Sequence, residues 1–250
     1  MNMRNRFKAI PATLMALLAS AGQALAEAAE THGGGELPNP RIAWNHTWAE
    51  VLVDLYVIGG VFALIAVYLL IKYRAKSPDA VGTAQPMNLD KALAWSLVPA
   101  ALFMADDFLL AAKGWSLWNI QRQVPPNALE IKVNAEQWNF SFDYGQGVGN
   151  ESELVVPVGR PVVLRMTSRD VIHSFGLNHY RVKEDIMPGR ITYIWFLPDE
   201  PLESRVVCVE FCGMAHSQMN TAVKAVEAAQ FDKWLAEKVE KAAAKKKTSA

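Results

Sequence analysis

The chain has 250 residues, with 25 Lys and Arg against 25 Asp and Glu, so its formal net charge is zero. Overall charge therefore indicates no particular partner, and we expect no nucleic acid among the partners. Hydrophobic residues make up 51% of the chain, and this length allows one or two domains with a real core.

The amino terminus has the layout of a secretory signal peptide. Arg4, Arg6 and Lys8 precede an apolar stretch over residues 9–19, and small residues end at Ala26. The alternative, a short membrane anchor, is disfavoured because the apolar run is too short. We expect residues 1–26 to be removed and residues 27–50 to form a periplasmic amino-terminal segment.

Two apolar segments follow, and each is long enough to cross a membrane. The first is residues 51–71, and the second is residues 92–112, which contains Pro99, Asp106 and Asp107. Acidic residues inside a membrane usually face protein or water, so the second helix either packs against another subunit or ends before Asp106. Both interpretations remain open at this point.

Basic residues fix the orientation of the pair. Lys72, Arg74 and Lys76 follow the first apolar segment, so the short loop 73–91 belongs in the cytoplasm. Residues 51–117 then form a two-helix transmembrane hairpin that returns the chain to the periplasm. We expect a multi-pass protein of the bacterial inner membrane, with everything after the hairpin in the periplasm.

Residues 118–230 have the pattern of an all-β domain, because short alternating apolar runs are separated by Gly, Pro, Asn and Asp. The expected strands are residues 129–133, 162–167, 191–197, 205–209 and 221–226. Residues 231–250 turn to Ala, Lys and Glu and predict a carboxy-terminal helix with a basic tail. The predicted fold class is a membrane-anchored all-β protein.

Soft ligands gather near the carboxy terminus. The six candidate metal ligands are His173, Cys208, Glu210, Cys212, His216 and Met219. In an oxidising compartment the two cysteines could form a disulfide, but a disulfide would not account for the histidine and methionine beside them. Zinc is a poorer candidate than copper because thioether is a weak zinc ligand. A blue copper site uses one cysteine, whereas two thiolate ligands indicate a binuclear copper site.

The remaining histidine ligand must come from outside this loop. His173 and His179 are both candidates, since both lie upstream of Cys208. His32 and His46 precede the first apolar segment and are expected to be ordinary exposed residues. The spacing alone leaves the choice between His173 and His179 open.

The pattern Cys-x-Glu-x-Cys-x-x-x-His-x-x-Met, with a histidine upstream in Asp170-Val-Ile-His173-Ser-Phe, resembles subunit II of cytochrome c oxidase. The resemblance also includes Pro188-Gly189-Arg190 and runs from the first apolar segment to about Trp234. It implies a two-helix transmembrane hairpin followed by a cupredoxin-like Greek-key β-barrel. It also implies a binuclear copper centre, CuA.

The resemblance implies a role for each ligand. Cys208 and Cys212 would bridge the two coppers, and His173 and His216 would each bind one of them. The family therefore favours His173 over His179.

Further roles follow from the same resemblance. Met219 and the backbone carbonyl of Glu210 would be weak copper ligands, and the Glu210 side chain would reach Mg²⁺ at the boundary with subunit I. Trp138 would receive the electron from cytochrome c. Asp143 and Asp170 match acidic positions that help to dock a basic cytochrome.

The implied function is that of subunit II of a cytochrome c oxidase, which passes electrons from cytochrome c to the haem–copper subunit I for reduction of O2 to water. Subunit III and the lipid membrane are further expected partners. Two departures from the family pattern weaken the assignment to a cytochrome c oxidase. Ala92 stands where the family often has a glutamate, and Asp90 is the nearest acid. Asn139 and Phe140 replace an aromatic pair. The alternative is the CuA subunit of a haem–copper nitric oxide reductase. A copper carrier and a ubiquinol oxidase subunit are less favoured, because the ligand set is complete.

Overall fold

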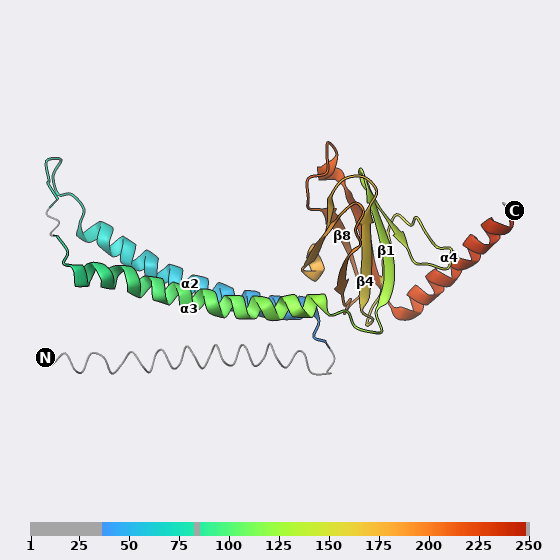
Figure 1. The fold of residues 1–250 in the computed structure, drawn as a ribbon, viewed down its shortest axis with the longest axis horizontal. Coiled ribbons are helices and arrows are strands. Elements are labelled where there is room, and N and C mark those ends of the chain that lie inside the picture. The colour runs from blue at the N-terminus through green and yellow to red at the C-terminus, as the bar shows by residue number, and fades with distance from the viewer. Residues whose placement is uncertain (1–36, 83–85, 249–250) are drawn as a thin grey trace. The chain divides into compact units, whose positions relative to one another are not determined.

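The computed structural model describes residues 37–82 and 86–248, which form two compact units (Figure 1). One unit is residues 45–117, and the other is residues 37–44 together with residues 118–248. Each unit is described by itself. The predicted signal peptide, residues 1–26, lies outside the described residues, as does the beginning of the segment 27–50.

The first unit is a helical hairpin. Helices α2 (Pro40–Lys72) and α3 (Leu89–Arg122) lie side by side in Figure 1, and Lys113 of α3 pairs with Glu50 of α2. Each helix contains an apolar window long enough to cross a membrane, and 0% of either window is buried in the described part of the chain. The two predicted apolar helices are therefore confirmed, and each is long and apolar enough to cross a membrane.

Both helices are longer than their apolar runs. Helix α2 begins at Pro40, a residue suited to the first helical position, and α3 continues through Pro99 and Asp106 to Arg122. The alternative in which the second helix ends before Asp106 is therefore wrong. The extra residues need no apolar surroundings, because an α-helix satisfies its own backbone hydrogen bonds wherever it lies.

The second unit is built around a β-sandwich. Its strands are β1 (Leu129–Glu136), β2 (Asn139–Asp143), β3 (Leu154–Pro157), β4 (Val162–Ser168), β5 (His173–Leu177), β6 (Val182–Ile186), β7 (Thr192–Phe196), β8 (Leu202–Cys208) and β9 (Asn220–Val226). They form a sheet of order β2-β1-β4-β7 and a sheet of order β3-β9-β8-β5-β6. The all-β fold class is confirmed.

The core lies between the two sheets. On β1, buried Ile131, Val133 and Ala135 alternate with more exposed neighbours, as expected for a strand with one face in the core. Across the core, Phe175 of β5 meets Phe140 of β2 edge to face, with 5.4 Å between the ring centroids. The sandwich therefore has a complete apolar interior of its own.

Four strands were missing from the sequence prediction: β2, β3, β5 and β6. Strands β3 and β5 are buried at every residue and show no alternation, so the period-2 signal that identifies a half-buried strand is absent. His173, a candidate ligand, is the first residue of β5.

Two flanking segments attach to the sandwich. Helix α4 (Ala228–Thr248) buries Phe231 in the core and packs Trp234 against Tyr144, with 5.0 Å between the ring centroids. At the other flank, the Asn39 side chain donates a hydrogen bond to the carbonyl of Leu197 at 3.3 Å. Residues before the first helix and after the last strand thus belong to the same unit.

Candidate metal centre

The loop that carries most of the candidate ligands is closed at its base. Strand β8 ends at Cys208 and β9 begins at Asn220, with the short helix η3 (His216–Gln218) between them. The N–H of Cys208 donates to the carbonyl of Met219 at 2.9 Å. This bond brings the first and last candidate ligands of the loop together.

Strand pairing brings the remaining ligand to this loop. Strand β5 is antiparallel to β8, and Phe175 lies opposite Cys208. Gly176 permits the approach, because a Cβ there would lie 2.7 Å from a methyl carbon of Val209. His173, two residues before Phe175, therefore lies beside Cys208, with 4.0 Å between His173 Nδ1 and Cys208 Sγ.

The donor atoms form a continuous array. The Sγ atoms of Cys208 and Cys212 are 3.7 Å apart, and Cys212 Sγ lies 3.6 Å from His216 Nδ1. Met219 Sδ is 3.7 Å from Cys212 Sγ, while the carbonyl oxygen of Glu210 is 3.3 Å from Cys208 Sγ. All six predicted residues thus meet at one end of the sandwich.

These separations suit shared metal ions. Two ligands that bind one tetrahedral ion at 2.0–2.3 Å lie about 3.5 Å from each other. Cys208 and Cys212 are both free, and His173, Cys208 and Cys212 are buried with donor atoms within 4.8 Å of one another. Each sulfur has an imidazole nitrogen and one weaker donor beside it, the Glu210 carbonyl at Cys208 and the Met219 thioether at Cys212. Sulfur and nitrogen donors of this kind fit copper.

The thiol pair needs a positive ion to lose its protons. Burial, together with a hydrogen bond to the neighbouring Cys208 thiol and repulsion by its negative charge, raises the pKa of Cys212 to about 11. Two thiolates 3.7 Å apart would repel each other in this buried setting. A bound cation removes that penalty, so the pair is suited to hold a metal.

Asp170 holds the ring of His173. Its carboxylate lies 2.9 Å from His173 Nε2 and accepts the backbone N–H of Gln137 at 2.8 Å. Burial opposes ionisation, but these hydrogen bonds outweigh it and lower the pKa of Asp170 to about 2. The carboxylate therefore stays ionised and leaves Nδ1 of His173 free to face the sulfurs.

The competing histidines lie elsewhere. His179 belongs to the short helix η2 (Asn178–Tyr180), beyond the far end of β5, and its Nε2 is 3.1 Å from Arg41 Nη1. A five-residue strand is about 15 Å long, which is too far for a shared metal. His46 lies on α2, 3.7 Å from Glu50, and His32 is outside the described residues.

Trp138 lies at the surface next to the loop. It is 40% exposed, so it is not a core aromatic, and a Cβ at Gly213 would lie 3.3 Å from its Nε1. Its neighbour Gln137 donates from Nε2 to the carbonyl of Cys212 at 2.8 Å. The sequence analysis missed this role of Gln137, since no sequence motif marks a glutamine that holds a ligand loop.

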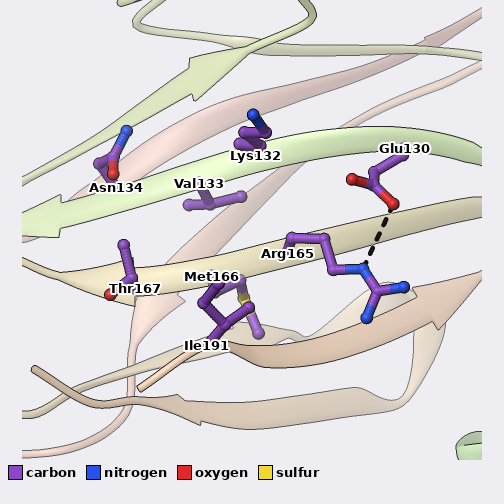
Figure 2. A pocket seen from close by; sticks show the side chains of 8 residues that line it. All are labelled: Glu130, Lys132, Val133, Asn134, Arg165, Met166, Thr167 and Ile191. Atoms are coloured by element: carbon purple, nitrogen blue, oxygen red, sulfur yellow. Dashed lines mark hydrogen bonds and ion pairs between the residues drawn. The ribbon is translucent and has the colours of Figure 1, made fainter. Parts of the chain in front are cut away.

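A cavity of about 420 Å³ lies on the outer face of the sheet β2-β1-β4-β7 (Figure 2). It is lined by Glu130, Lys132, Val133, Asn134, Arg165, Met166, Thr167 and Ile191. Arg165 and Glu130 pair across it at 3.3 Å. None of the lining residues is a candidate ligand, so the cavity is separate from the metal centre.

Comparisons with known proteins agree with this site. Residues 146–226, which include the whole ligand loop and His173, match the family model "Cytochrome C oxidase subunit II, periplasmic domain". The chain is 27% identical over 207 residues to cytochrome c oxidase subunit 2 of Alkalihalophilus pseudofirmus, covering 79% of this chain and 59% of that one. It is 26% identical over 227 residues to the alternative cytochrome c oxidase subunit 2 of Bradyrhizobium diazoefficiens, covering 77% and 80%.

Among solved structures, the periplasmic domain of subunit II of the cytochrome oxidase of Bradyrhizobium japonicum is 32% identical. The match covers 49% of this chain and 99% of that one, with a TM-score of 0.44. The family model over residues 146–226 and the sequence relatives over most of the chain support a subunit II of the cytochrome c oxidase type.

Proposed function

We propose that this chain is the copper subunit of a cytochrome c oxidase, which accepts electrons from cytochrome c and passes them to subunit I, where O2 is reduced to water. One observation carries the proposal: the continuous array His173, Cys208, Cys212 and His216, with Met219 and the Glu210 carbonyl beside the two sulfurs. When bound there, a copper pair supplies one-electron redox chemistry.

The protein's part is to hold the ligands in one geometry. Cys208 and His173 are held by paired strands, Met219 is fixed to Cys208 through the backbone, and Gln137 fixes Cys212. Asp170 keeps the His173 ring oriented. A frame that fixes these four ligands changes little when the charge of the centre changes, which favours fast electron transfer.

Electrons are proposed to arrive through Trp138. Its partly exposed indole can touch a donor protein, and the same indole lies against the loop at Gly213, next to Cys212. On the outgoing side, Glu210 offers an exposed side chain while its carbonyl faces Cys208. We propose that this carboxylate contributes to a Mg²⁺ site at the boundary with subunit I.

The proposed setting is the bacterial inner membrane. Lys72, Arg74 and Lys76 support a cytoplasmic loop 73–91, and the copper domain, residues 118–230, would then lie in the periplasm. Subunit I, and with it subunit III, would bind the hairpin 51–117. The proposed organisation also includes a signal peptide at residues 1–26, a periplasmic segment at residues 27–50 and a terminal helix at residues 231–250.

A second candidate function is the CuA subunit of a haem–copper nitric oxide reductase. Ala92, in the second turn of α3, occupies the place where the family often has a glutamate at the mouth of a proton path. Asp90 is in the first turn of the same helix. A reductase that does not use this proton path would have less need of the glutamate.

The deciding experiment uses the complex purified with its membrane subunits and loaded with copper. Consumption of O2 and of NO is measured in parallel, with reduced cytochrome c as the donor. Rapid O2 uptake with two coppers per copy of this chain is expected. NO consumption without O2 uptake would select the second candidate, and one labile copper per chain would contradict a binuclear centre.

A further inference from the structure

Met214 places a sulfur atom in solvent next to the buried metal centre. Its side chain is 95% exposed, and among the described residues 118–248 it is the one exposed side chain of any methionine or cysteine. Within the described part of the chain it takes part in no hydrogen bond, ion pair or ring contact. Neither packing nor polar contacts therefore account for a thioether at this position in the ligand loop.

The candidate metal centre has a closed side and an open side. His173, Cys208, Cys212 and Met219 are all buried. His216 is partly exposed, and it is the one imidazole, thiol or thioether donor of the array that is not buried. An ion that comes from outside the protein therefore reaches the donor array at His216.

A tight turn places Met214 on this open side. The N–H of His216 donates to the carbonyl of Gly213 at 3.1 Å, so Met214 and Ala215 form the tip of the turn. Gly213 has a φ of +121°, which favours glycine at the start of the turn. Met214 is two residues from Cys212 and two from His216, so its Cα lies within about 7 Å of each of theirs. An unbranched, flexible side chain can turn from solvent toward either ligand.

The donor atoms differ in strength from the outside to the inside of this loop. A thioether is a soft, uncharged ligand that suits Cu(I) and is poor for hard cations. A single thioether in water holds such an ion weakly and releases it readily. Behind it lie the Sγ atoms of Cys208 and Cys212, 3.7 Å apart, which bind as charged thiolates. A weak outer ligand followed by strong inner ligands gives the ion a direction of movement.

We propose that Met214 is an entry ligand, which takes Cu(I) from outside the protein and passes it to Cys212 and His216. The proposal rests on the proposed function and adds the route by which the centre is filled. A bond from copper to Met214 Sδ forms as a bond to the incoming ligand breaks. That bond then breaks as bonds to Cys212 Sγ and His216 Nδ1 form, and the thiol proton leaves to water. Copper stays Cu(I) throughout, so no oxidant or reductant takes part.

The test follows the filling of the metal-free, fully reduced chain in detergent without oxygen. Cu(I) is supplied as its bicinchoninate complex, whose colour disappears as the protein takes the metal, and stopped flow measures the rate. Copper content is measured when the reaction is complete. We expect the unmodified chain to take two coppers.

Substitutions at Met214 separate the sulfur from the shape of the side chain. Met214→Leu keeps an exposed apolar side chain of similar size but has no sulfur. It should slow filling by about tenfold, the lower end of the loss seen when a residue that supports a metal site is changed. The final copper content should still be two. Met214→His supplies a different copper ligand and should restore the rate to within about threefold of the unmodified chain.

Met87→Leu is the matched control. Met87 is also an exposed methionine, at 60%, but it belongs to the unit of residues 45–117, which carries none of the candidate ligands. Its removal takes one exposed thioether from the chain without changing the loop. The rate of filling should equal that of the unmodified chain.

Three results would overturn the proposal while leaving the proposed function intact. An unchanged rate in Met214→Leu would mean that the centre fills without the thioether. A slow rate that Met214→His does not restore would assign Met214 to the packing of the loop. Fewer than two coppers in the filled Met214→Leu chain would make Met214 a permanent ligand. If the unmodified chain itself took up no copper or only one, the binuclear centre of the proposed function would be contradicted.

Discussion

The helical hairpin and the β-sandwich place the same kinds of side chain in opposite positions. In α2, Phe62 and Leu64 are each 73% exposed, whereas Phe142 and Leu164 in the sandwich are 0% exposed. An apolar surface on the outside is stable only in an apolar solvent, and an apolar interior is stable in water. The hairpin therefore depends on its surroundings, while the sandwich supplies its own core.

This difference explains why the candidate metal centre is on the sandwich. A rigid site needs ligands fixed by neighbours within the same unit, and His173, Cys208 and Cys212 are all buried there. In the hairpin, by contrast, none of the described residues in the two apolar windows is buried. The hairpin supplies two exposed apolar helices, and the sandwich holds the candidate metal centre.

The largest expected effect separates the metal from the fold. Cys212→Ser, like Cys208→Ser, should abolish the binuclear copper centre, because a single remaining thiolate cannot bridge in the same way. The sandwich should remain folded, since its core is apolar. Copper content, the visible and electron-spin spectra, and circular dichroism measure the two halves of this prediction.

The control for these variants is His179→Ala, which removes a histidine at the other end of β5. Copper content and spectra should not change, because His179 contacts Arg41 rather than the sulfurs. A normal binuclear spectrum in a cysteine variant, or copper loss in the His179 variant, would refute the ligand assignment.

The next effect tests whether the sandwich is stable independently of the hairpin. Leu164→Ala should lower the free energy of unfolding of the sandwich by about 2–5 kcal/mol, because it leaves a cavity in a fully buried position. Leu64→Ala, on the exposed surface of α2, should change it by less than about 0.5 kcal/mol. Urea unfolding of the metal-free chain in detergent, followed by near-ultraviolet circular dichroism, measures both. Equal losses would mean that the two regions unfold as one.

A smaller effect is expected from the residue that orients His173. Asp170→Asn keeps the shape but replaces a carboxylate with a weaker acceptor, and copper affinity should fall by about 10- to 100-fold. Competition with a copper chelator measures this change. Asp143→Asn is the control, because Asp143 touches only the turn at Gly145. Unchanged copper affinity in the Asp170 variant would mean that Asp170 does not orient His173 and is an ordinary surface acid.

The smallest expected effect is on the rate of electron arrival, through Trp138, an exposed aromatic side chain of the sandwich. Trp138→Phe should slow electron arrival from the donor severalfold while leaving the copper spectrum intact, because Phe is smaller and lacks the indole that lies against Gly213. Stopped-flow reduction of the copper centre measures the rate. If the rate does not change, electrons enter by another route, and the exposed indole has only a packing role.

Local patterns in the sequence predicted much of this molecule. The apolar runs predicted both hairpin helices, and alternation predicted strands such as β1, where only one face is buried. Strands β3 and β5 were missed because both of their faces are buried, so neither shows a period. The run from Cys208 to Met219 was readable because its ligands lie within one loop.

By itself, the sequence determined the two apolar helices, the β-rich domain and the chemical character of the candidate metal ligands, since each depends on composition or short spacing. Only the tertiary structure decided which histidine lies beside Cys208, because that depends on the pairing of β5 with β8 across 35 residues of chain. It also decided that Asp170 faces His173 and that Gln137 holds the loop at Cys212. Contacts between distant segments arise from strand pairing and packing, which no local pattern encodes.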